Sequence, residues 1–414
     1  MGRLADGRLV SIPGTLPGEQ VTARLNGGNR HVTAAQLLQV VHPSPERVAP
    51  PCQHAAMCGG CTLQHWATQP YLAWKTERLR EALVRAGFID PPVVSTVAIS
   101  PDTRRRVDLA YAPSAGGTAL GFHGSRDRHV IDIQDCTILH EDLRRLITPL
   151  RHLLSGLSAC RQPGSVHINL LDSGPDILLG LAGSPTSKDR DRLLSFARAV
   201  GACRIHYAYG SGEPELLAML AAPTVTFGDI RVSPPPGSFL QASRDGERHL
   251  VKAALNALPS PLPKRARFLD LYAGCGTFTL PLAAHGVVDA FEGDVRAVAA
   301  LRQAAHHALP GRVAAHHRDL LRRPLAGQEL RGYAVAVIDP PWAGAGGQIA
   351  ALAASTVPRI IYVSCNPASL SNDARILRDA GFDVTRATPV DQFVWSAHLE
   401  SVVVFAKRGS PRQT

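Results

Sequence analysis

The chain has 414 residues, 45% of them hydrophobic, which predicts two or three domains with ample apolar material for their cores. Lys and Arg number 44 against 34 Asp and Glu, and the net charge of +10 favours a polyanionic partner such as nucleic acid. There is no apolar run of membrane-spanning length, no signal-peptide pattern and too few cysteines for a disulfide scaffold, so we expect a cytoplasmic protein without a membrane partner.

The first 41 residues alternate short β-like runs with Pro-Gly and Gly-Gly turns, a pattern typical of a small β-barrel. Barrels of this kind often bind nucleic acid. The stretch 42–52, HPSPERVAPPC, is rich in proline and is expected to be a linker.

Three cysteines follow within ten residues, in CQHAAMCGGC. Cys52, Cys58 and Cys61 have the spacing C-x5-C-x2-C, which packing alone does not explain, and two glycines let the backbone fold around the sulfurs. A fourth ligand is required, and Cys136 is the best available sulfur. Four thiolates suit an iron–sulfur cluster or structural zinc, and the spacing does not separate the two.

Residues 69–86 have the apolar spacing of an amphipathic helix, and Gly87 ends it. From about 93 to 231 the pattern is β-rich and is interrupted by one helix, DRDRLLSFARAV. Within this region Arg104-Arg105-Arg106 precedes a strand. The triplet is interpreted either as a phosphate contact or as a solvated cluster.

A proline-rich stretch at 233–239 marks a second domain boundary. Beyond it, RFLDLYAGCGTFTLPLAAHG predicts a strand, a glycine-rich turn and a helix, with Asp270 and Glu292 at the ends of successive strands. Glycines at the turn let a bulky cofactor approach the backbone, and an acid about 20 residues further on can hold ribose hydroxyls. Together with HHRDL and VAVIDPPWAG, this pattern predicts an adenosyl-binding sheet.

The stretch RIIYVSCNPASLSNDARIL predicts a buried strand that stops at Cys365, with Asn366 as N-cap of the next helix. Cys365 would then face a cleft beside a helix N-terminus, whose partial positive charge favours the nucleophilic thiolate. The alternative is a small core residue at a strand end. In HLESVVVFAKR, His398 and Glu400 are two residues apart and are predicted to share one face of a strand.

These residues jointly resemble one family, the S-adenosylmethionine-dependent RNA uracil-5-methyltransferases that carry a four-iron four-sulfur cluster and form 5-methyluridine in 23S rRNA. The resemblance covers nearly the whole chain and rests on CQHAAMCGGC with Cys136, GSFLQAS, FLDLYAGCGTFTLPLA, FEGD, VIDPP, YVSCNP and HLES. It implies an α/β architecture of three parts. These are a short N-terminal TRAM/OB-like barrel (1–43), a central β-rich iron–sulfur domain (44–69 and 101–235), and a Rossmann-like class I methyltransferase domain (70–100 and 236–410).

The resemblance also implies roles for single residues. Cys365 would be the nucleophile and Glu400 the base. The cofactor S-adenosylmethionine would be bound by Gln241, Tyr272, Gly274, Glu292, Asp319 and Asp339, and the cluster by Cys52, Cys58, Cys61 and Cys136. The chain departs from the family pattern at Trp342, where Arg is common after Asp-Pro-Pro, and at Ser243, where Asn is usual.

We therefore expect a monomeric enzyme that methylates carbon 5 of a uridine in RNA, with ribosomal RNA favoured over transfer RNA. The alternatives are an RNA cytosine-5-methyltransferase using the same thiol chemistry, a catalytically retired RNA-binding or assembly factor, and a redox-sensing role for the cluster.

Overall fold

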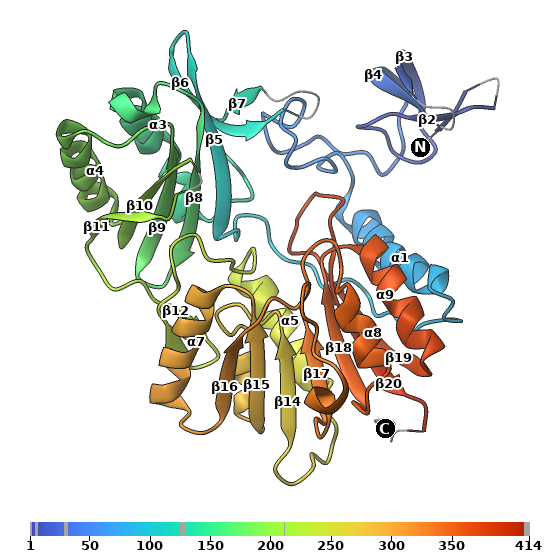
Figure 1. The fold of residues 1–414 in the computed structure, drawn as a ribbon. Helices are drawn as coiled ribbons and strands as arrows, with labels where there is room; N and C mark the ends of the chain where they lie inside the picture. The colour runs from blue at the N-terminus through green and yellow to red at the C-terminus, as the bar shows by residue number, and fades with distance from the viewer. Residues whose placement is uncertain (1, 5–6, 29–31, 125–128, 211, 410–414) are drawn as a thin grey trace.

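The computed structural model describes residues 2–4, 7–28, 32–124, 129–210 and 212–409. Short pieces of the predicted segments 1–43, 101–235 and 236–410 lie outside these ranges. Figure 1 shows three main bodies: an N-terminal sheet set apart at one corner, a central sheet, and a catalytic sheet flanked by helices. No helix in the described ranges is long and apolar enough to cross a membrane.

The N-terminal sheet has four strands in the order β1-β2-β4-β3. Their bounds are β1 (Gly2–Arg3), β2 (Leu9–Ser11), β3 (Gln20–Gly28) and β4 (Val32–His42). Strands β3 and β4 are the longest pair and run antiparallel. The first strand is only two residues long.

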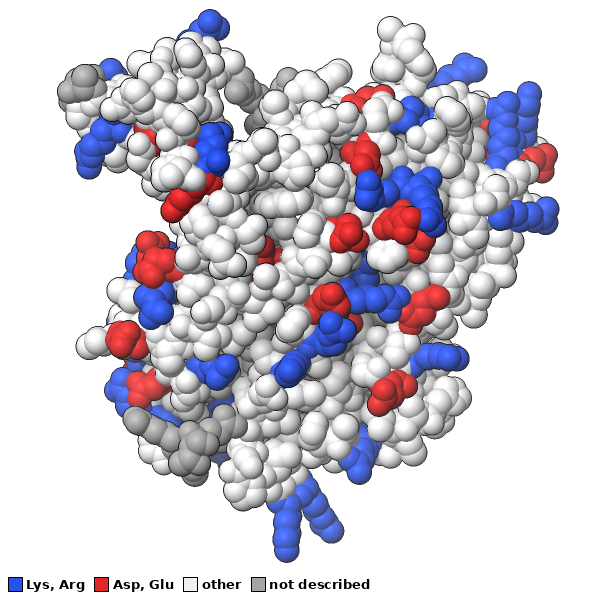
Figure 2. Space-filling model, turned by 180° about the vertical axis from the view of Figure 1, so that it is seen from behind, with Lys and Arg blue, Asp and Glu red and all other residues white. Residues whose placement is uncertain are grey.

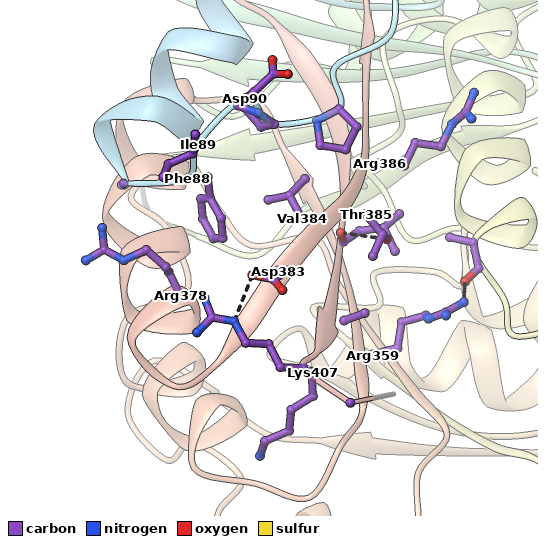
Figure 3. A pocket seen from close by; sticks show the side chains of 18 of the residues that line it. Phe88, Ile89, Asp90, Arg359, Arg378, Asp383, Val384, Thr385, Arg386 and Lys407 are labelled. Atoms are coloured by element: carbon purple, nitrogen blue, oxygen red, sulfur yellow. Dashed lines mark hydrogen bonds and ion pairs between the residues drawn. The ribbon is translucent and has the colours of Figure 1, made fainter. Parts of the chain in front are cut away.

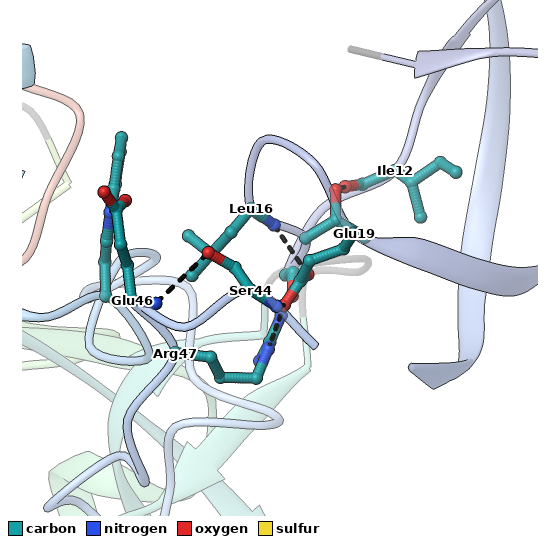
Figure 4. Close-up of polar contacts among 9 residues, drawn as sticks. Ile12, Leu16, Glu19, Ser44, Glu46 and Arg47 are labelled. Atoms are coloured by element: carbon teal, nitrogen blue, oxygen red, sulfur yellow. Dashed lines mark hydrogen bonds and ion pairs between the residues drawn. The ribbon is translucent and has the colours of Figure 1, made fainter. Parts of the chain in front are cut away.

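The proline-rich stretch after this sheet is a connection without helix or strand, and Arg47 anchors it to the N-terminal part of the chain. Arg47 donates to both carboxylate oxygens of Glu19, from Nε at 2.5 Å and from Nη2 at 2.7 Å. Glu19 also accepts the backbone N–H of Leu16 at 2.8 Å (Figure 4). The Arg47 guanidinium lowers the pKa of Glu19 to about 2, so this link is ionised at neutral pH.

The central sheet has seven strands in the order β11-β10-β9-β8-β5-β6-β7. Its strands are β5 (Arg106–Ser114), β6 (Gly117–His123), β7 (Val130–Asp132), β8 (Gly164–Leu171), β9 (Gly174–Leu181), β10 (Arg204–Tyr209) and β11 (Glu215–Met219). A small hairpin, β12 (Val225–Phe227) with β13 (Ile230–Val232), follows.

The predicted helix of this region is α4 (Ser187–Val200), but α2 (Glu141–Arg144) and α3 (Ile147–Gly156) are present as well. The expectation of one helix was therefore wrong. Helix α3 buries Ile147, Leu150 and Leu154 in the core of the central sheet, which gives it the apolar face that a surface helix needs.

The catalytic sheet has seven strands in the order β16-β15-β14-β17-β18-β20-β19. All its strands run parallel except β20. The strands are β14 (Arg267–Leu271), β15 (Val287–Glu292), β16 (Val313–His317), β17 (Val335–Ile338), β18 (Arg359–Ser364), β19 (Phe382–Val390) and β20 (Glu400–Lys407). The helices are α5 (Arg244–Asn256), α6 (Thr279–Ala283), α7 (Val295–Ala308), α8 (Gly347–Ala353) and α9 (Pro367–Asp379). This is a Rossmann-like architecture, and the carboxyl ends of its parallel strands meet at one edge.

Helix α1 (Thr68–Arg85) belongs by contact to the catalytic body, although it comes far earlier in the chain. It lies beside α9 in Figure 1, and its Leu79 and Leu83 share an apolar core with Leu370 and Leu377. The chain then follows β19, where Val93 and Val97 form isolated bridges, before it returns to the central sheet.

Candidate active site

Cys365 directly follows β18, whose six residues are all buried. The chain turns there because Asn366 caps α9, accepting the N–H of Ala368 at 3.0 Å, and Pro367 takes the first helical position. The predicted strand, cap and helix are thereby confirmed. Cys365 is half-buried at the carboxyl edge of the sheet.

Glu400 lies opposite Cys365 across two antiparallel strands. Ser364 of β18 pairs with Ser401 of antiparallel β20. One step further in the same register, Cys365 faces Glu400. Glu400 is the first residue of β20 and is 3% exposed. The order of the strands thus brings together two residues that are 35 positions apart in sequence.

His398 does not share a strand face with Glu400, so that prediction is wrong. Strand β20 begins only at Glu400, and His398 lies in the preceding loop with an exposed side chain. Its ring meets the ring of Trp342 edge-on, with centroids 5.1 Å apart. The Trp342 side chain is 52% exposed, and its carbonyl accepts a hydrogen bond from Asn366 Nδ2 at 3.0 Å. An aromatic surface therefore stands next to Cys365 at the position where the family commonly has Arg.

A chain of hydrogen bonds runs through the buried side chains around Glu400. Gln241 donates from Nε2 to Oδ2 of Asp339 at 3.2 Å. Gln392 donates from Nε2 to Oε1 of Gln241 at 2.8 Å and to Oε2 of Glu400 at 2.7 Å. Two acids from different strands are thus connected through two amides. Sequence reasoning missed Gln392, because it lies in the loop between β19 and β20 and has no motif of its own.

Burial and mutual repulsion favour the neutral forms of the acids at this edge. Burial, with the charge of Asp339 second, raises the pKa of Glu400 well above its usual range. Burial raises the pKa of Asp339 to about 7. Burial, Glu400 and Asp339 in that order raise the pKa of the Cys365 thiol to about 12. This net shift is opposite in sign to the stabilisation of the thiolate expected from the helix terminus.

The predicted cofactor residues line up along the same edge. In strand order, Asp319 follows β16, Glu292 ends β15, Tyr272 follows β14 and Asp339 follows β17. The Glu292 carboxylate accepts the backbone N–H of Gly274 at 2.8 Å. The edge that a nucleoside would approach is therefore continuous from β16 to β18.

The glycine-rich turn has a conformation that suits close approach to the backbone. Tyr272 has φ +63° and Gly274 has φ +55°, both in the left-handed region. The Tyr272 hydroxyl donates to the carbonyl of Ala345 at 3.3 Å, and Asp319 caps its own loop by accepting the N–H groups of Leu321 and Arg322. At Gly274 a Cβ would have no heavy atom within 4 Å, so open space lies in front of this turn.

The arginine triplet divides into three environments. Arg105 is 1% exposed and pairs with Glu247 of α5, so for this residue both sequence interpretations are wrong. Arg106 is half-buried, with its guanidinium 4.2 Å from the centroid of the Phe239 ring, which is 61% exposed. Arg104 is half-buried and donates from Nε to the carbonyl of Arg106 at 2.9 Å. The motif GSFLQAS contains Phe239 but gave no sign that its ring is exposed next to Arg106.

Ser243, the second departure from the family pattern, is the N-cap of α5. Its hydroxyl accepts the N–H of Gly246 at 2.9 Å. Ser and Asn are equally good at this position, so the substitution preserves the local structure.

The four cysteines of the predicted cluster line one cavity of about 350 Å³ between the N-terminal segment and the central sheet. Burial raises the pKa of Cys61 to about 11 and of Cys136 to about 12, and neighbouring cysteines add to both shifts. Across the described ranges, however, no three Cys, His, Asp or Glu side chains lie close enough to hold one metal ion. The structure gathers the sulfurs around one space without bringing them to ligand distance.

A second cavity of about 960 Å³ lies at the opposite edge of the catalytic sheet, where β18 begins and β20 ends. Its lining includes Arg359, Arg378, Arg386, Lys407 and Arg408, with Asp383 paired to Arg408 (Figure 3). It contains none of the predicted catalytic or cofactor residues. The predicted catalytic and cofactor residues therefore lie at the carboxyl edge of the sheet, away from this basic cavity.

Comparisons with known proteins agree with this geometry. The sequence model of the tRNA (uracil-5-)-methyltransferase family matches residues 294–408. An uncharacterized RNA methyltransferase of Caulobacter vibrioides is 39% identical, over 98% of this chain and 96% of that protein. A 23S rRNA (uracil(1939)-C(5))-methyltransferase of Aeromonas hydrophila is 32% identical, over 97% of this chain and 92% of its own.

The crystal structure of Pyrococcus abyssi tRNA (uracil-54, C5)-methyltransferase with S-adenosyl-L-homocysteine has the same fold, with a TM-score of 0.73 over 98% of both chains at 19% identity. Full-length similarity above 30% identity and the shared fold lead to one conclusion: the chain belongs to the family of S-adenosylmethionine-dependent RNA (uracil-5-)-methyltransferases.

Proposed function

We propose that this enzyme methylates carbon 5 of a uridine in 23S rRNA, with Cys365 as nucleophile and Glu400 as base. The observation that carries the proposal is the register of β18 and β20, which sets Cys365 opposite a buried carboxyl group. The choice of 23S rRNA is supported by the Aeromonas relative, which is similar over nearly its whole length. The Pyrococcus tRNA enzyme supports the fold alone, because only 19% of its residues are identical.

The chemistry requires a thiol and a base on the same substrate. Carbon 5 of uracil is a poor nucleophile, so the Cys365 sulfur first bonds to carbon 6 and the electron pair of the C5–C6 double bond moves into an enolate. Carbon 5 then takes the methyl group of S-adenosylmethionine, and the remainder of that molecule leaves as S-adenosylhomocysteine. Glu400 removes the proton from carbon 5, the double bond re-forms, and the bond between carbon 6 and the sulfur breaks.

The two acids near Cys365 have a consistent role in this scheme. Because burial raises its pKa, the ionised form of Glu400 is a stronger base than an exposed carboxylate. Cys365 attacks as the thiolate, so its proton passes to solvent first, and the positive sulfonium of bound S-adenosylmethionine would favour that ionised form by Coulomb attraction. The Gln241–Asp339 pair presents amide and carboxylate groups that suit hydrogen bonding to a nucleobase.

We propose that the cofactor lies along the edge formed by Gln241, Tyr272, Gly274, Glu292, Asp319 and Asp339. Glu292 suits ribose hydroxyls, because a carboxylate accepts several hydrogen bonds and this one already holds the Gly274 turn. The target base must leave its stack to reach the cleft, which an unpaired nucleotide does at low cost.

Exposed Phe239 and Trp342 offer flat faces for neighbouring bases. On the face shown in Figure 2, acidic and basic side chains alternate, so the net charge of +10 is not gathered there.

We also propose that residues 44–69 and 101–235 form the domain that holds a four-iron four-sulfur cluster through Cys52, Cys58, Cys61 and Cys136, and that residues 1–43 form a TRAM-like RNA-binding barrel. The shared 350 Å³ cavity supports the first proposal, because four thiols are the donor set of such a cluster. The protein purified without oxygen should be brown and contain iron, and Cys58→Ser should lose both. Cys203→Ser, at a buried cysteine of the neighbouring core, should keep them. A colourless protein with one zinc would overturn the assignment.

Mass spectrometry of RNA digests tests the proposed substrate. Cells without the gene should lose 5-methyluridine from one position of 23S rRNA, and the gene should restore it. Loss of 5-methyluridine from transfer RNA alone, or of 5-methylcytosine, would overturn the choice.

A further inference from the structure

Gln392 connects the two halves of the candidate site. It lies in the loop 391–399 between β19 and β20, is 4% exposed, and contacts both Gln241 and Glu400 with one nitrogen atom. Neither the family comparison nor the sequence motifs give this residue a role.

The hydrogen bonds around Gln392 form one directed chain. Gln241 donates from its nitrogen to Asp339, and the Gln241 oxygen faces Gln392. Gln392 must then present its nitrogen to Gln241, and the second N–H of that nitrogen is directed at Glu400. Both donors of the Gln392 amide are used, and a turned amide would lose both bonds at once.

Packing holds the Gln392 side chain in this orientation. A Cβ added at Gly246 of α5 would lie 2.8 Å from Gln392 Cβ and 2.9 Å from Gln392 Oε1, so helix and side chain are in close contact. Gln392 Oε1 and Glu400 Oε1 are buried without a hydrogen-bond partner within the described part of the chain. Contact with α5 and the two donated hydrogen bonds therefore fix the orientation of the amide together, although its oxygen stays unpaired.

The charged groups around Glu400 come from three other elements. Asp339, after β17, raises the pKa of Glu400, and Arg106 of β5 lowers it. Cys365, after β18, faces Glu400 and is itself affected by its charge. Gln392 is the neutral donor in this set, and its hydrogen bond opposes burial by stabilising the carboxylate.

We infer that Gln392 is a positioning residue that holds the Glu400 carboxylate ready to take the carbon 5 proton and ties it to the Gln241–Asp339 pair. The inference rests on the proposed role of Glu400 as base. Nucleophilic attack and methyl transfer do not use this carboxylate as a base, so the loss of Gln392 slows the last step most. The methylated covalent intermediate then accumulates.

Two variants test this inference. Gln392→Met keeps the length of the side chain and removes both donors. Gln392→Glu keeps the shape and donates at most one hydrogen bond, which protects the test if the first variant does not fold. With substrate RNA and labelled S-adenosylmethionine, both should give a labelled protein–RNA band that survives denaturation. Release of methylated RNA should fall about tenfold at neutral pH, the size expected for a lost hydrogen bond to a charged group.

The pH profile separates positioning from general damage. Without its donor Glu400 holds its proton more tightly, so the rising limb of the release rate should move to higher pH by about one unit. Gln348→Met is the matched control. Gln348 is fully buried in the same domain, and its amide forms two hydrogen bonds with the backbone of Leu325. This control should leave the pH profile unchanged and accumulate no adduct.

The outcomes distinguish the inference from the proposal beneath it. If Glu400→Gln accumulates the adduct while both Gln392 variants turn over with the wild-type pH profile, Gln392 has no positioning role. If Glu400→Gln accumulates none, the assignment of Glu400 as base fails first.

Discussion

The guanidinium of Arg105 donates from Nη2 to Oε2 of Glu247 at 2.5 Å, and the side chains are 1% and 11% exposed. Arg105 directly precedes the first strand of the central sheet, and Glu247 lies in the first turn of α5 in the catalytic domain. Arg105 Nε also donates to the backbone carbonyl of Gln241 at 3.2 Å. A buried ion pair therefore holds the two domains together beside a residue of the candidate site.

Arg105→Met should destabilise the protein by about 3 kcal/mol, because it leaves the Glu247 carboxyl group buried without a partner. Urea unfolding measures the change. The double variant Arg105→Met, Glu247→Leu should recover most of the loss, since it removes both charges. If the single variant unfolds like the wild type, the pair contributes nothing to the junction.

Arg106→Gln should weaken RNA binding and lower the slope of log Kd against log salt by about one, because Arg106 is the member of the triplet next to exposed Phe239. Filter binding at several salt concentrations measures the slope. Arg248→Gln is the control, because its side chain is 70% exposed and pairs with Asp245 of the same helix. Equal slopes for all three proteins would exclude a phosphate contact by Arg106.

Cys365→Ala should reduce methyl transfer by at least about 10³-fold while S-adenosylmethionine binding stays close to normal, because the proposed cofactor contacts come from other residues. Calorimetry and incorporation of labelled methyl measure the two properties. Cys160→Ala, at a buried cysteine of the central core, is the control.

RNA with 5-fluorouridine at the target should trap the wild type covalently, since fluorine cannot leave as a proton does. The absence of an adduct with a proven substrate would exclude the thiol mechanism.

Glu400→Gln should slow turnover by about 10²- to 10⁴-fold, the usual contribution of a general base. The labelled adduct should persist on a denaturing gel, because attack and methyl transfer come before proton removal. The double variant Cys365→Ala, Glu400→Gln should lose the band. Normal turnover by the single variant would show that another group removes the proton.

Asp270 should make the protein less stable as the pH rises. Burial raises its pKa from 3.8 to about 7, and only Thr279 donates to it among the described side chains, at 2.5 Å. Between these two values the folded chain holds a proton that the unfolded chain has lost, so stability falls through this window and is lowest above it.

Asp270→Asn should reduce the fall in unfolding free energy across this window by about 4 kcal/mol at most. A smaller fall should remain, because the pKa of Asp339 is raised in the same direction. Urea unfolding at pH near 4 and near 8, on either side of this window, measures the change. An unchanged difference between the two would contradict the assignment.

The sequence could predict what local patterns determine. The apolar run before Cys365 and the Asn-Pro pair after it determined strand, cap and helix, because each signal lies within a few residues of the structure it forms. The meeting of Cys365 with Glu400 followed from the family resemblance, whereas in the structure it depends on strand order.

The errors arose where contacts between residues distant in sequence determine the environment of a side chain. Arg105 is buried because Glu247, 142 residues away, pairs with it, and no local pattern separates it from its two neighbours. Gln392 acts through Gln241 across 151 residues from a loop without regular structure. His398 was placed on a strand because its spacing from Glu400 fits a strand, but the loop ends only at Glu400.

The contacts of helix α1 have a consequence for synthesis of the protein on the ribosome. Its Lys75 forms a buried ion pair with Asp391, a residue synthesised 316 positions later, and its Leu79 and Leu83 pack against the equally late α9. Until the last part of the chain emerges, the apolar face of this amphipathic helix lacks its packing partners on α9. In a prematurely terminated chain the apolar face of α1 therefore stays exposed to solvent, and in the complete chain α9 covers it.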